Sequence, residues 1–307
     1  MFSPIEVIIN ASSGSVEQEE TKQRLIDLFA ENGVKANVHL AKNGSEIIEL
    51  AKKTAKGKAE IIVAGGGDGT VSAIASEIIK TDKTLGILPL GTLNNFSKDL
   101  QIPQDIEEAV RVVAEMNVKQ IDVGEVNGRI FVNNSSIGLY PQIVKNRERQ
   151  QRIGYGKWRA AFWAALKILR RSPFLQIKLK TGDKERLVKT PFVFVGNNEY
   201  KMDFFNVGRR ECLTDGKLSV YFLHKSGRRG LFSLVLRTVF GRLRQAADFE
   251  EINVEEITIE TRKKQMLVAF DGEVDMLKTP LCYCVRQLAL RVIVPKENEK
   301  SSTDERE

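Results

Sequence analysis

The stretch that decides the fold is Ala59-Glu60-Ile61-Ile62-Val63-Ala64-Gly65-Gly66-Gly67-Asp68-Gly69-Thr70. A short apolar run leads into four glycines, and the chain then enters a stretch whose apolar residues recur at helical spacing: Val71, Ile74, Ala75 and Ile78. Glycines at the end of a parallel strand let backbone N–H groups approach an anion, and a following helix N-terminus adds partial positive charge. The stretch therefore predicts a strand, a phosphate-binding turn and a helix. A glycine-rich turn without a ligand is the alternative.

The same alternation of strand and helix patterns fills the first third of the chain. Strands are predicted at residues 5–9, 36–40, 61–64 and 85–88. Helices are predicted around Leu25 to Phe29, from a cap at Ser45 to Gly57, from Val71, and over residues 106–113. Repeated strand–helix units imply a parallel sheet covered by helices on both faces. The N-terminal part is therefore expected to be an α/β domain.

The pattern changes near residue 120. Asn127-Gly128 lies between two strand-like runs and is the strongest short hairpin signal. More strands are predicted at residues 174–180, 191–195, 218–223, 257–261, 266–270 and 288–294. We therefore expect an α/β domain at residues 1–125, a mainly β domain at 126–295 and a charged, disordered tail at 296–307.

Two further polar loops end predicted strands of the first domain. One is Pro89-Leu90-Gly91-Thr92-Leu93-Asn94-Asn95-Phe96, and the other is Asn10-Ala11-Ser12-Ser13-Gly14. Loops at the carboxyl ends of neighbouring parallel strands share one crevice. Thr92 and Asn94 are therefore expected to face the same ligand as the glycine loop, and a nucleotide is favoured. Taken alone, the loop from Asn10 could be a simple helix entry.

Ala269-Phe270-Asp271-Gly272-Glu273 closes a predicted strand of the second domain. Paired carboxylates suit deprotonation or orientation of an attacking hydroxyl group, although a plain hairpin turn is the interpretation that the residues alone favour. The chain has only two histidines, His39 and His224, and neither has a metal-type partner at suitable spacing. Any catalytic base should therefore be a carboxylate.

The composition indicates where the protein works and what kind of partner it has. With 307 residues, 42% of them hydrophobic, the chain is long enough for two cores, and its formal charge of +7 favours anionic partners. Three cysteines are too few for a disulfide framework, the N-terminus does not resemble a signal peptide, and no apolar run is long enough to span a bilayer. We therefore expect a cytoplasmic protein, soluble or peripheral to the membrane.

Two segments combine basic residues with aromatic or bulky apolar ones. Residues 145–171 hold nine Lys and Arg against the single acid Glu148, interleaved with Tyr155, Trp158, Phe162 and Trp163. Residues 225–244 are basic, without an acid, and carry Phe232 and Phe240. This composition suits an anionic membrane surface. A solvated basic face and a nucleic-acid surface are the alternatives, and no RNA-binding signature favours the latter.

The glycine loop, Pro89 to Asn94 and Asp271-Gly272-Glu273, in this order, resemble the diacylglycerol kinase catalytic-domain family, particularly its soluble bacterial lipid kinases. The resemblance extends from Asn10 to about Val294 and implies a phosphofructokinase-like α/β domain, a β-sandwich domain and ATP in the cleft between them. It places Asn10 to Gly14, Gly65 to Val71 and Thr92 on the nucleotide. It also implies that Glu273 is the base for the lipid hydroxyl, supported by Asp271.

The resemblance further implies magnesium. Asp122 matches the family's aspartate before the second domain, and Cys212-Leu213-Thr214-Asp215-Gly216-Lys217 matches its magnesium-ordering loop. The expected metal residues are Asp68, Asp122, Cys212, Asp215 and Lys217, of which Cys212 and Lys217 would bind through main-chain carbonyls. A simple turn is the alternative for this loop. The chain departs from the family at Asn95, where an aspartate is common, and at Ala41, near where a threonine often reaches the nucleotide.

The function expected from the resemblance is transfer of the γ-phosphoryl group of ATP to a lipid hydroxyl, converting diacylglycerol to phosphatidic acid. Two alternatives remain open: a kinase for soluble NAD or a sugar phosphate, and an inactive nucleotide-sensing peripheral membrane protein. Ceramide or a sphingoid base, monoacylglycerol and phosphatidylglycerol also present a suitable hydroxyl group. The oligomeric state, a homodimer included, is equally open.

Overall fold

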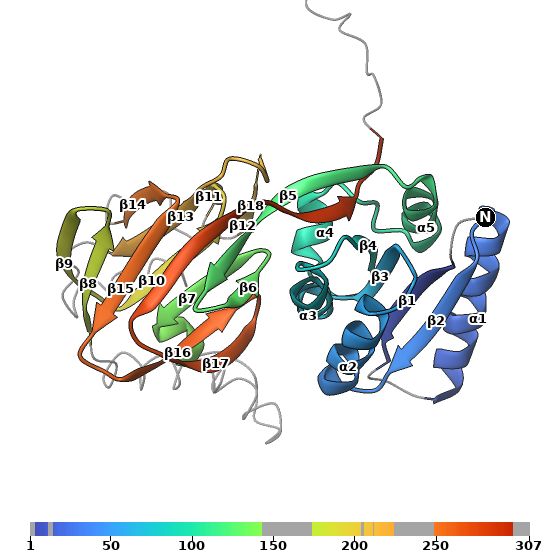
Figure 1. Cartoon of the computed structure of the whole chain (residues 1–307), viewed down its shortest axis with the longest axis horizontal. Helices are drawn as coiled ribbons and strands as arrows, with labels where there is room; N and C mark the ends of the chain where they lie inside the picture. Colours follow the sequence, from blue (N-terminus) through green and yellow to red (C-terminus); the bar gives the residue numbers. More distant parts are fainter. Residues whose placement is uncertain are drawn as a thin grey trace, which may run out of the picture. The chain divides into compact units, whose positions relative to one another are not determined.

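The computed structural model describes residues 4–11, 15–142, 174–203, 206–210, 212–223 and 249–296. The chain divides into two compact units, drawn in Figure 1. Unit 1 comprises Met1–Gln120 and Leu290–Glu307, and unit 2 comprises Ile121–Ala289. The sequence placed the domain boundary at residue 125 and the end of the second domain at residue 295. Residues 290–295 fall in unit 1 because the last strand, β18 (Leu281–Ile293), pairs there through Arg291 and Val292.

Unit 1 is built on a parallel sheet, as predicted. Its strands are β1 (Ile5–Asn10), β2 (Ala36–Ala41), β3 (Ile61–Gly66) and β4 (Thr84–Pro89), in the order β2-β1-β3-β4. All three pairings are parallel, and β4 also pairs in parallel with the end of β18. The central strands are almost wholly buried, with Ile8, Ile62 and Leu85 inaccessible to solvent. This burial explains why they read as continuous apolar runs.

Five helices accompany this sheet in the described part of unit 1. They are α1 (Ser15–Glu31), α2 (Gly44–Ala55), α3 (Asp68–Ile78), α4 (Asn95–Asp99) and α5 (Ile106–Glu115). α1 contacts α5, and α2 contacts α3, so two pairs of helices form. The crossovers from β2 to β3 and from β3 to β4 move in the same direction across the sheet, and connections of the same hand therefore put α2 and α3 on the same face.

One predicted helix start was wrong. Asn43, and not Ser45, caps α2, because the Asn43 side chain accepts a hydrogen bond from the Glu46 amide at 3.0 Å. The Glu46 carboxylate in turn accepts from the Lys42 amide at 2.7 Å. This arrangement is close to a capping box, which satisfies otherwise unpaired N–H groups in the first turn.

Unit 2 begins with the predicted hairpin. β5 (Val118–Val126) pairs with β6 (Arg129–Phe131), and Asn127 and Gly128 between them have φ values of 48° and 83°. Both values lie in the left-handed region, as the two-residue turn that matches strand twist requires. The Asn127 side chain donates to the carbonyls of Lys278 and Pro280, so this turn also secures a second loop.

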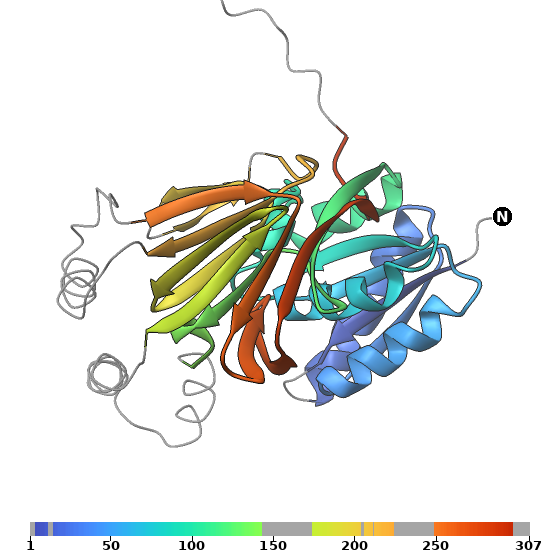
Figure 2. The same cartoon turned by 60° about the vertical axis from the view of Figure 1, so that its left-hand side comes forward.

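Two antiparallel sheets follow, and both are visible in Figures 1 and 2. The first has the order β14-β13-β10-β7-β16-β17. Its bounds are Phe249–Val254, Leu218–Leu223, Phe192–Asn197, Asn134–Gly138, Gln265–Phe270 and Glu273–Lys278. The second has the order β18-β15-β8-β9, with β15 at Glu256–Thr261, β8 at Leu175–Thr181 and β9 at Lys184–Thr190, and β5 pairs with β18 and β6. β11 (Tyr200–Asp203) and β12 (Asn206–Arg210) pair separately.

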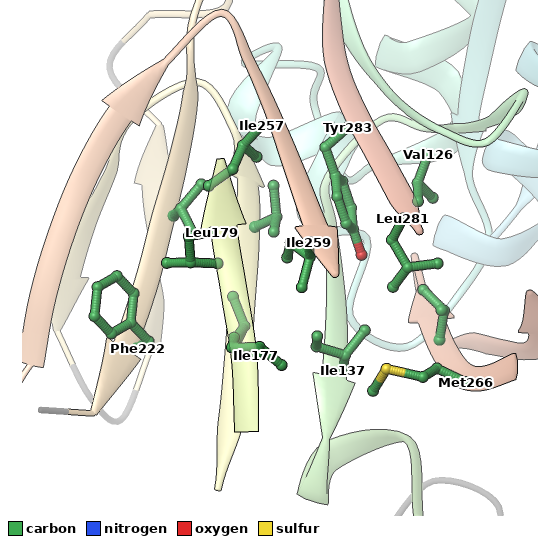
Figure 3. Packing of buried hydrophobic residues seen from close by; sticks show 14 of the residues in the cluster. Val126, Ile137, Ile177, Leu179, Phe222, Ile257, Ile259, Met266, Leu281 and Tyr283 are labelled. Atoms are coloured by element: carbon green, nitrogen blue, oxygen red, sulfur yellow. The ribbon is translucent and has the colours of Figure 1, made fainter. Parts of the chain in front are cut away.

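The hydrophobic core of unit 2 lies between these two sheets, as Figure 3 shows. Ile137 and Phe222 come from the first sheet, and Ile177, Ile259 and Tyr283 come from the second. Tyr283 is fully buried, and its hydroxyl lies 3.1 Å from the Ser135 Oγ. Burial raises the pKa of Tyr283, so this side chain is neutral at physiological pH. The predicted β-sandwich is confirmed.

The two basic aromatic segments predicted at residues 145–171 and 225–244 lie outside the described residues, as does the tail after Lys296. Among the residues that are described, none of the helices combines the length and the apolar character needed to cross a bilayer.

We predict that Gly124→Ala destabilises unit 2. Gly124 lies in β5, and a Cβ added there would overlap the buried ring of Phe131. Overpacking of this kind costs about 2–3 kcal/mol, which urea titration followed by circular dichroism would detect. Gly44→Ala is the matched control, because an added Cβ there meets nothing within 4 Å. Equal stability of both variants would show that Phe131 does not pack on Gly124.

Candidate functional site

Three loops of unit 1 meet at the carboxyl edge of its sheet. β1 ends at Asn10, β3 at Gly66 and β4 at Pro89, and the register pairs Gly65 with Ile9 and Gly66 with Pro89. The chain leaves β1 toward β2 on one side and leaves β3 toward β4 on the other. Such a topological switch point opens a crevice in which open α/β sheets bind ligands. The glycine loop therefore lies at the position where a ligand is expected.

Direct contacts join these loops. The Asn10 amide group donates to the Thr70 Oγ1 at 3.4 Å. A Cβ added to Gly67 would lie 3.4 Å from the Gly91 Cα, so the two loop backbones are in contact. The structure thus brings together the beginning of the first predicted loop, the glycine loop and the loop after β4. Ser12, Ser13 and Gly14 lie outside the described residues, and Ala11 is buried.

The glycine loop presents a helix N-terminus without a side-chain cap. α3 begins at Asp68, directly after Gly67, which provides no capping side chain. The first N–H groups of a helix lack partners within the helix and attract anions. Gly66 must be glycine because a Cβ there would lie 2.5 Å from the Thr70 Oγ1. Backbone groups, not side chains, therefore dominate this part of the site.

The Asp68 carboxylate connects the glycine loop to α4. Its two oxygens accept hydrogen bonds from the amides of Asn95, at 3.1 Å, and Phe96, at 2.9 Å. Asp68 thereby caps the N-terminus of α4, where a negative charge is also favoured by the helix dipole. The Asn95 side chain is exposed beside it.

Asn94 shapes the loop after β4 from within. It is buried, has a φ of 51°, and its Oδ1 accepts from the Gly91 amide at 3.0 Å. Its Nδ2 donates to the carbonyls of Pro89, at 3.1 Å, and Gly91, at 2.8 Å. Thr92 at the tip of this loop is exposed. Of the two residues predicted to face a ligand here, Thr92 is accessible, whereas the Asn94 side chain holds the loop together.

In unit 2, Asp271 and Gly272 form a tight turn between β16 and β17. Their φ values are 48° and 88°, so the hairpin interpretation is confirmed. The buried Asp271 carboxylate accepts from the amides of Val132 (2.7 Å), Asn133 (2.8 Å) and Asn134 (3.1 Å). Glu273 is the first residue of β17 and is exposed. Asp271 thus fixes the turn, and Glu273 is accessible to solvent.

Asp122, like Asp271, binds backbone amides through a buried carboxylate. It is 1% exposed, and its carboxylate accepts from the amides of Gly216, at 2.7 Å, and Leu288, at 2.8 Å. Its own amide donates to the Leu213 carbonyl at 2.8 Å. Asp122 therefore orders the predicted metal loop, in which the Asp215 side chain is exposed. In the part of the chain that the structure describes, no three His, Cys, Asp or Glu side chains are grouped as a metal site.

A buried polar network connects Asp122 with Asp271, and the sequence reasoning missed it. The Asn197 amide group donates to the carbonyls of Asp122 (2.9 Å) and Val132 (3.0 Å). Arg210, 4% exposed, donates to the Asn133 Oδ1 at 2.8 Å and to the Val132 carbonyl at 2.6 Å. Gly196-Asn197-Asn198 directly follows an apolar strand, which is the signal that identified Asn10 and could have identified this network.

The chain combines two kinds of domain. Unit 1 is a parallel α/β domain with a glycine loop of the type that binds phosphate, and unit 2 is a β-sandwich with an exposed carboxylate on a hairpin. Residues 4–126 match the family model described as diacylglycerol kinase catalytic domain. This part of the chain is similar to the catalytic domain of diacylglycerol kinases.

Curated relatives cover parts of the chain. A diacylglycerol kinase of Bacillus subtilis is 32% identical over 141 residues, which are 45% of this chain and 46% of that protein. A Chromohalobacter salexigens protein called "Probable lipid kinase YegS-like" is 29% identical over 195 residues, 62% of this chain and 61% of the relative. The chain thus spans about half the length of the curated relatives it matches.

The fold also has solved counterparts. A crystal structure of a diacylglycerol kinase from Bacillus anthracis strain Sterne has a TM-score of 0.68 and 21% identity. The match covers 96% of this chain and 97% of that one. At this level of identity the likeness concerns the fold.

We predict that Asp271→Asn costs about 3 kcal/mol of unfolding free energy. The asparagine would keep one acceptor oxygen for three backbone amides and would turn an N–H₂ group toward them. Asp275→Asn on the same hairpin is the control, because Asp275 makes an exposed ion pair with Arg129, and such pairs contribute at most about 1 kcal/mol. Urea titration measures both variants, and similar losses would refute the structural role of Asp271.

Proposed function

We propose that the chain is an ATP-dependent lipid kinase that transfers the γ-phosphoryl group to a lipid hydroxyl, with diacylglycerol as substrate and phosphatidic acid as product. The observation that carries this proposal is the glycine loop at the switch point of unit 1, within residues 4–126, which match the diacylglycerol kinase catalytic domain. Names of relatives add support, since the Bacillus subtilis protein is called diacylglycerol kinase.

The nucleotide would be held mainly by backbone groups of unit 1. N–H groups around Gly67 and the start of α3, which has no side-chain cap, would meet the triphosphate. The contact between Gly67 and Gly91 keeps the two loops at a fixed separation, so that Thr92 at the loop tip lies beside the same crevice. Positioning of this kind supplies most of the catalysis in phosphoryl transfer.

Asp68 fits a role beside magnesium. Mg²⁺ in phosphoryl-transfer sites uses one or two carboxylates together with substrate phosphates and water. The half-buried Asp68 carboxylate accepts the amides of Asn95 and Phe96 and would contact the ion through water. When bound, Mg²⁺ would neutralise charge on the phosphates. Asp215, exposed on the loop that Asp122 orders, is the second candidate.

Glu273 is proposed as the general base. It would accept the proton of the lipid hydroxyl while that oxygen forms its bond to the γ-phosphorus, and the bond from phosphorus to the β–γ bridging oxygen breaks to release ADP. Glu273 is exposed at the start of β17, whereas Asp271 is buried and committed to three amides. Asp271 is therefore a positioning residue, and proton transfer falls to Glu273.

The decisive experiment is phosphorylation with radiolabelled ATP in mixed micelles. The panel contains diacylglycerol, ceramide, monoacylglycerol and phosphatidylglycerol, with NAD and a sugar phosphate as soluble acceptors. Labelled phosphatidic acid is the expected product. Labelling of a soluble acceptor alone would replace the proposal by a soluble kinase. ATP binding without labelling of any acceptor would identify a nucleotide sensor.

We predict that Glu273→Gln lowers kcat by about 10²–10⁴-fold and leaves ATP affinity unchanged. Glutamine preserves size and hydrogen bonding but cannot accept the proton. Turnover assays and calorimetric ATP titration separate the two effects. Glu256→Gln, at an exposed position in β15, is the control and should retain activity. Full turnover by Glu273→Gln would remove this residue as the base.

We also predict that Asn95→Asp preserves or raises magnesium-dependent activity. The Asn95 side chain is exposed at the start of α4, close to the Asp68 carboxylate that caps this helix. A carboxylate at this position strengthens attraction for a divalent cation and suits a helix N-terminus. Activity titrated against Mg²⁺ provides the measurement. A large loss of activity would show that this chain organises its metal differently from the proposal.

A further inference from the structure

The strand registers give the β-sandwich of unit 2 two distinct ends. Asp122, Asp271 and Glu273 belong to one end, because loops joined to β7, β10 and β13 meet there through the buried network. β17 runs from Glu273 at this end to Lys278 at the opposite end. Lys278 pairs with Gln265, the first residue of β16, so the turn between β15 and β16 also lies at the opposite end.

Five exposed cations cluster at this opposite end. They are Lys189, Arg262, Lys263, Lys264 and Lys278, here called the basic tip. Register places them together: Ile177 pairs with both Thr261 and Val188, the neighbours of Arg262 and Lys189. The Thr279 amide donates to the Lys264 carbonyl at 3.1 Å, which links the Lys278 strand end to the turn.

The basic tip differs from the cations beside it in lacking counter-charges. Lys178, Lys180 and Arg186 on β8 and β9 each pair with a glutamate. Among the described residues, no carboxylate lies within ion-pairing distance of any side chain of the basic tip. The nearby acids are already engaged, since Asp275 pairs with Arg129 at 2.7 Å and Glu260 pairs with Lys180 at 2.7 Å. The tip therefore carries uncompensated positive charge.

Apolar groups accompany this charge. Lys189 and Arg262 line a cavity of about 500 Å³ together with Leu187, which is 83% exposed. The Lys189 ammonium group lies 5.8 Å from the centre of the Phe174 ring. Exposed leucine beside cations suits the boundary between lipid headgroups and acyl chains. The phosphate backbone of a nucleic acid offers no apolar layer that an exposed leucine could contact.

Chain continuity points to the same end. Residues 145–171 follow β7, which ends at Gly138, and precede β8, which begins at Leu175. A Cβ on Gly138 would lie 3.0 Å from the Leu175 side chain, so these strand ends adjoin. Residues 225–244 lie between Leu223 and Phe249, which pair with each other. The described strand ends that flank these two sequence segments, at Gly138, Leu175, Leu223 and Phe249, therefore belong to the end that carries the basic tip.

We propose that the basic tip docks unit 2 onto an anionic bilayer, an inference that rests on the proposed lipid substrate for its biological sense. Lys and Arg close to such a surface each strengthen binding about fivefold at physiological salt. Cations that have no counter-charge among the described residues are more available for this attraction than the paired cations on β8 and β9. Leu187 adds an apolar contact at the same surface.

Vesicle co-sedimentation without ATP tests the proposal. The probe is phosphatidylcholine vesicles with and without phosphatidylglycerol. The variant Arg262→Gln/Lys263→Gln/Lys264→Gln should lose on the order of 100-fold in affinity for the anionic vesicles. Lys53→Gln/Lys56→Gln/Lys58→Gln in unit 1 removes the same charge from exposed positions and should bind nearly as the unaltered chain does. Circular dichroism confirms folding of both variants.

Equal losses in both triple variants would overturn the proposal, because net charge alone would then explain binding. Unchanged vesicle affinity in both triple variants would also overturn the docking proposal. Preferential binding of RNA through Arg262, Lys263 and Lys264 would overturn it too. Leu187→Ser should weaken vesicle binding without changing charge, and unchanged binding would exclude the apolar contact. A short-chain soluble diacylglycerol separates the docking proposal from the proposed kinase function. The Arg262→Gln/Lys263→Gln/Lys264→Gln variant should phosphorylate this substrate at the normal rate, because no docking is needed. If the unaltered chain binds vesicles but phosphorylates no lipid, the docking proposal stands and the proposed kinase function is refuted.

Discussion

A carboxylate withdrawn from water has to be satisfied by hydrogen bonds, and backbone amides satisfy the buried Asp122 and Asp271 and also bind the half-buried Asp68. Asp68 holds the start of α4, Asp122 holds Gly216 and Leu288, and Asp271 holds residues 132–134. Leaving such a charge unpaired would cost several kcal/mol, so each aspartate fixes the loops it contacts. The segments joined in this way lie between 27 and 166 residues apart in sequence.

The need to satisfy buried carboxylates distinguishes acids that look alike in the sequence motifs. Asp271 and Glu273 read as a matched pair of acids, but Asp271 is buried against amides and Glu273 is exposed. The same division holds for Asp122 and Asp215. In both cases a buried aspartate supports a loop, and the other acid is exposed. A glycine-centred motif with two carboxylates can therefore combine a structural carboxylate with one that is accessible to solvent.

Much of the fold could be predicted because its signals are local. Parallel strands buried on both faces appear as apolar runs, and Asn127-Gly128 specifies its own turn. β9 and β17 escaped prediction because they are edge strands whose sequences mix polar and apolar residues without a continuous apolar run, as in Lys184-Glu185-Arg186-Leu187. Among the candidate site residues, the roles of Asn94 and Asp122 depend on partners that only the folded chain brings near. The network around Arg210 was missed for the same reason.

β17 carries Glu273 at its first residue and Lys278 at its last. A strand of this length spans about 17 Å, so a unit docked by its basic tip holds the reactive carboxylate up to that height above the lipid phosphates. Val274, Met276 and Leu277 lie along the strand between the two ends, and Met276 is half exposed. If the proposed docking and the proposed base both hold, a lipid would have to rise out of the bilayer plane to reach Glu273, and the half-exposed Met276 is the apolar side chain of β17 that it would meet on the way.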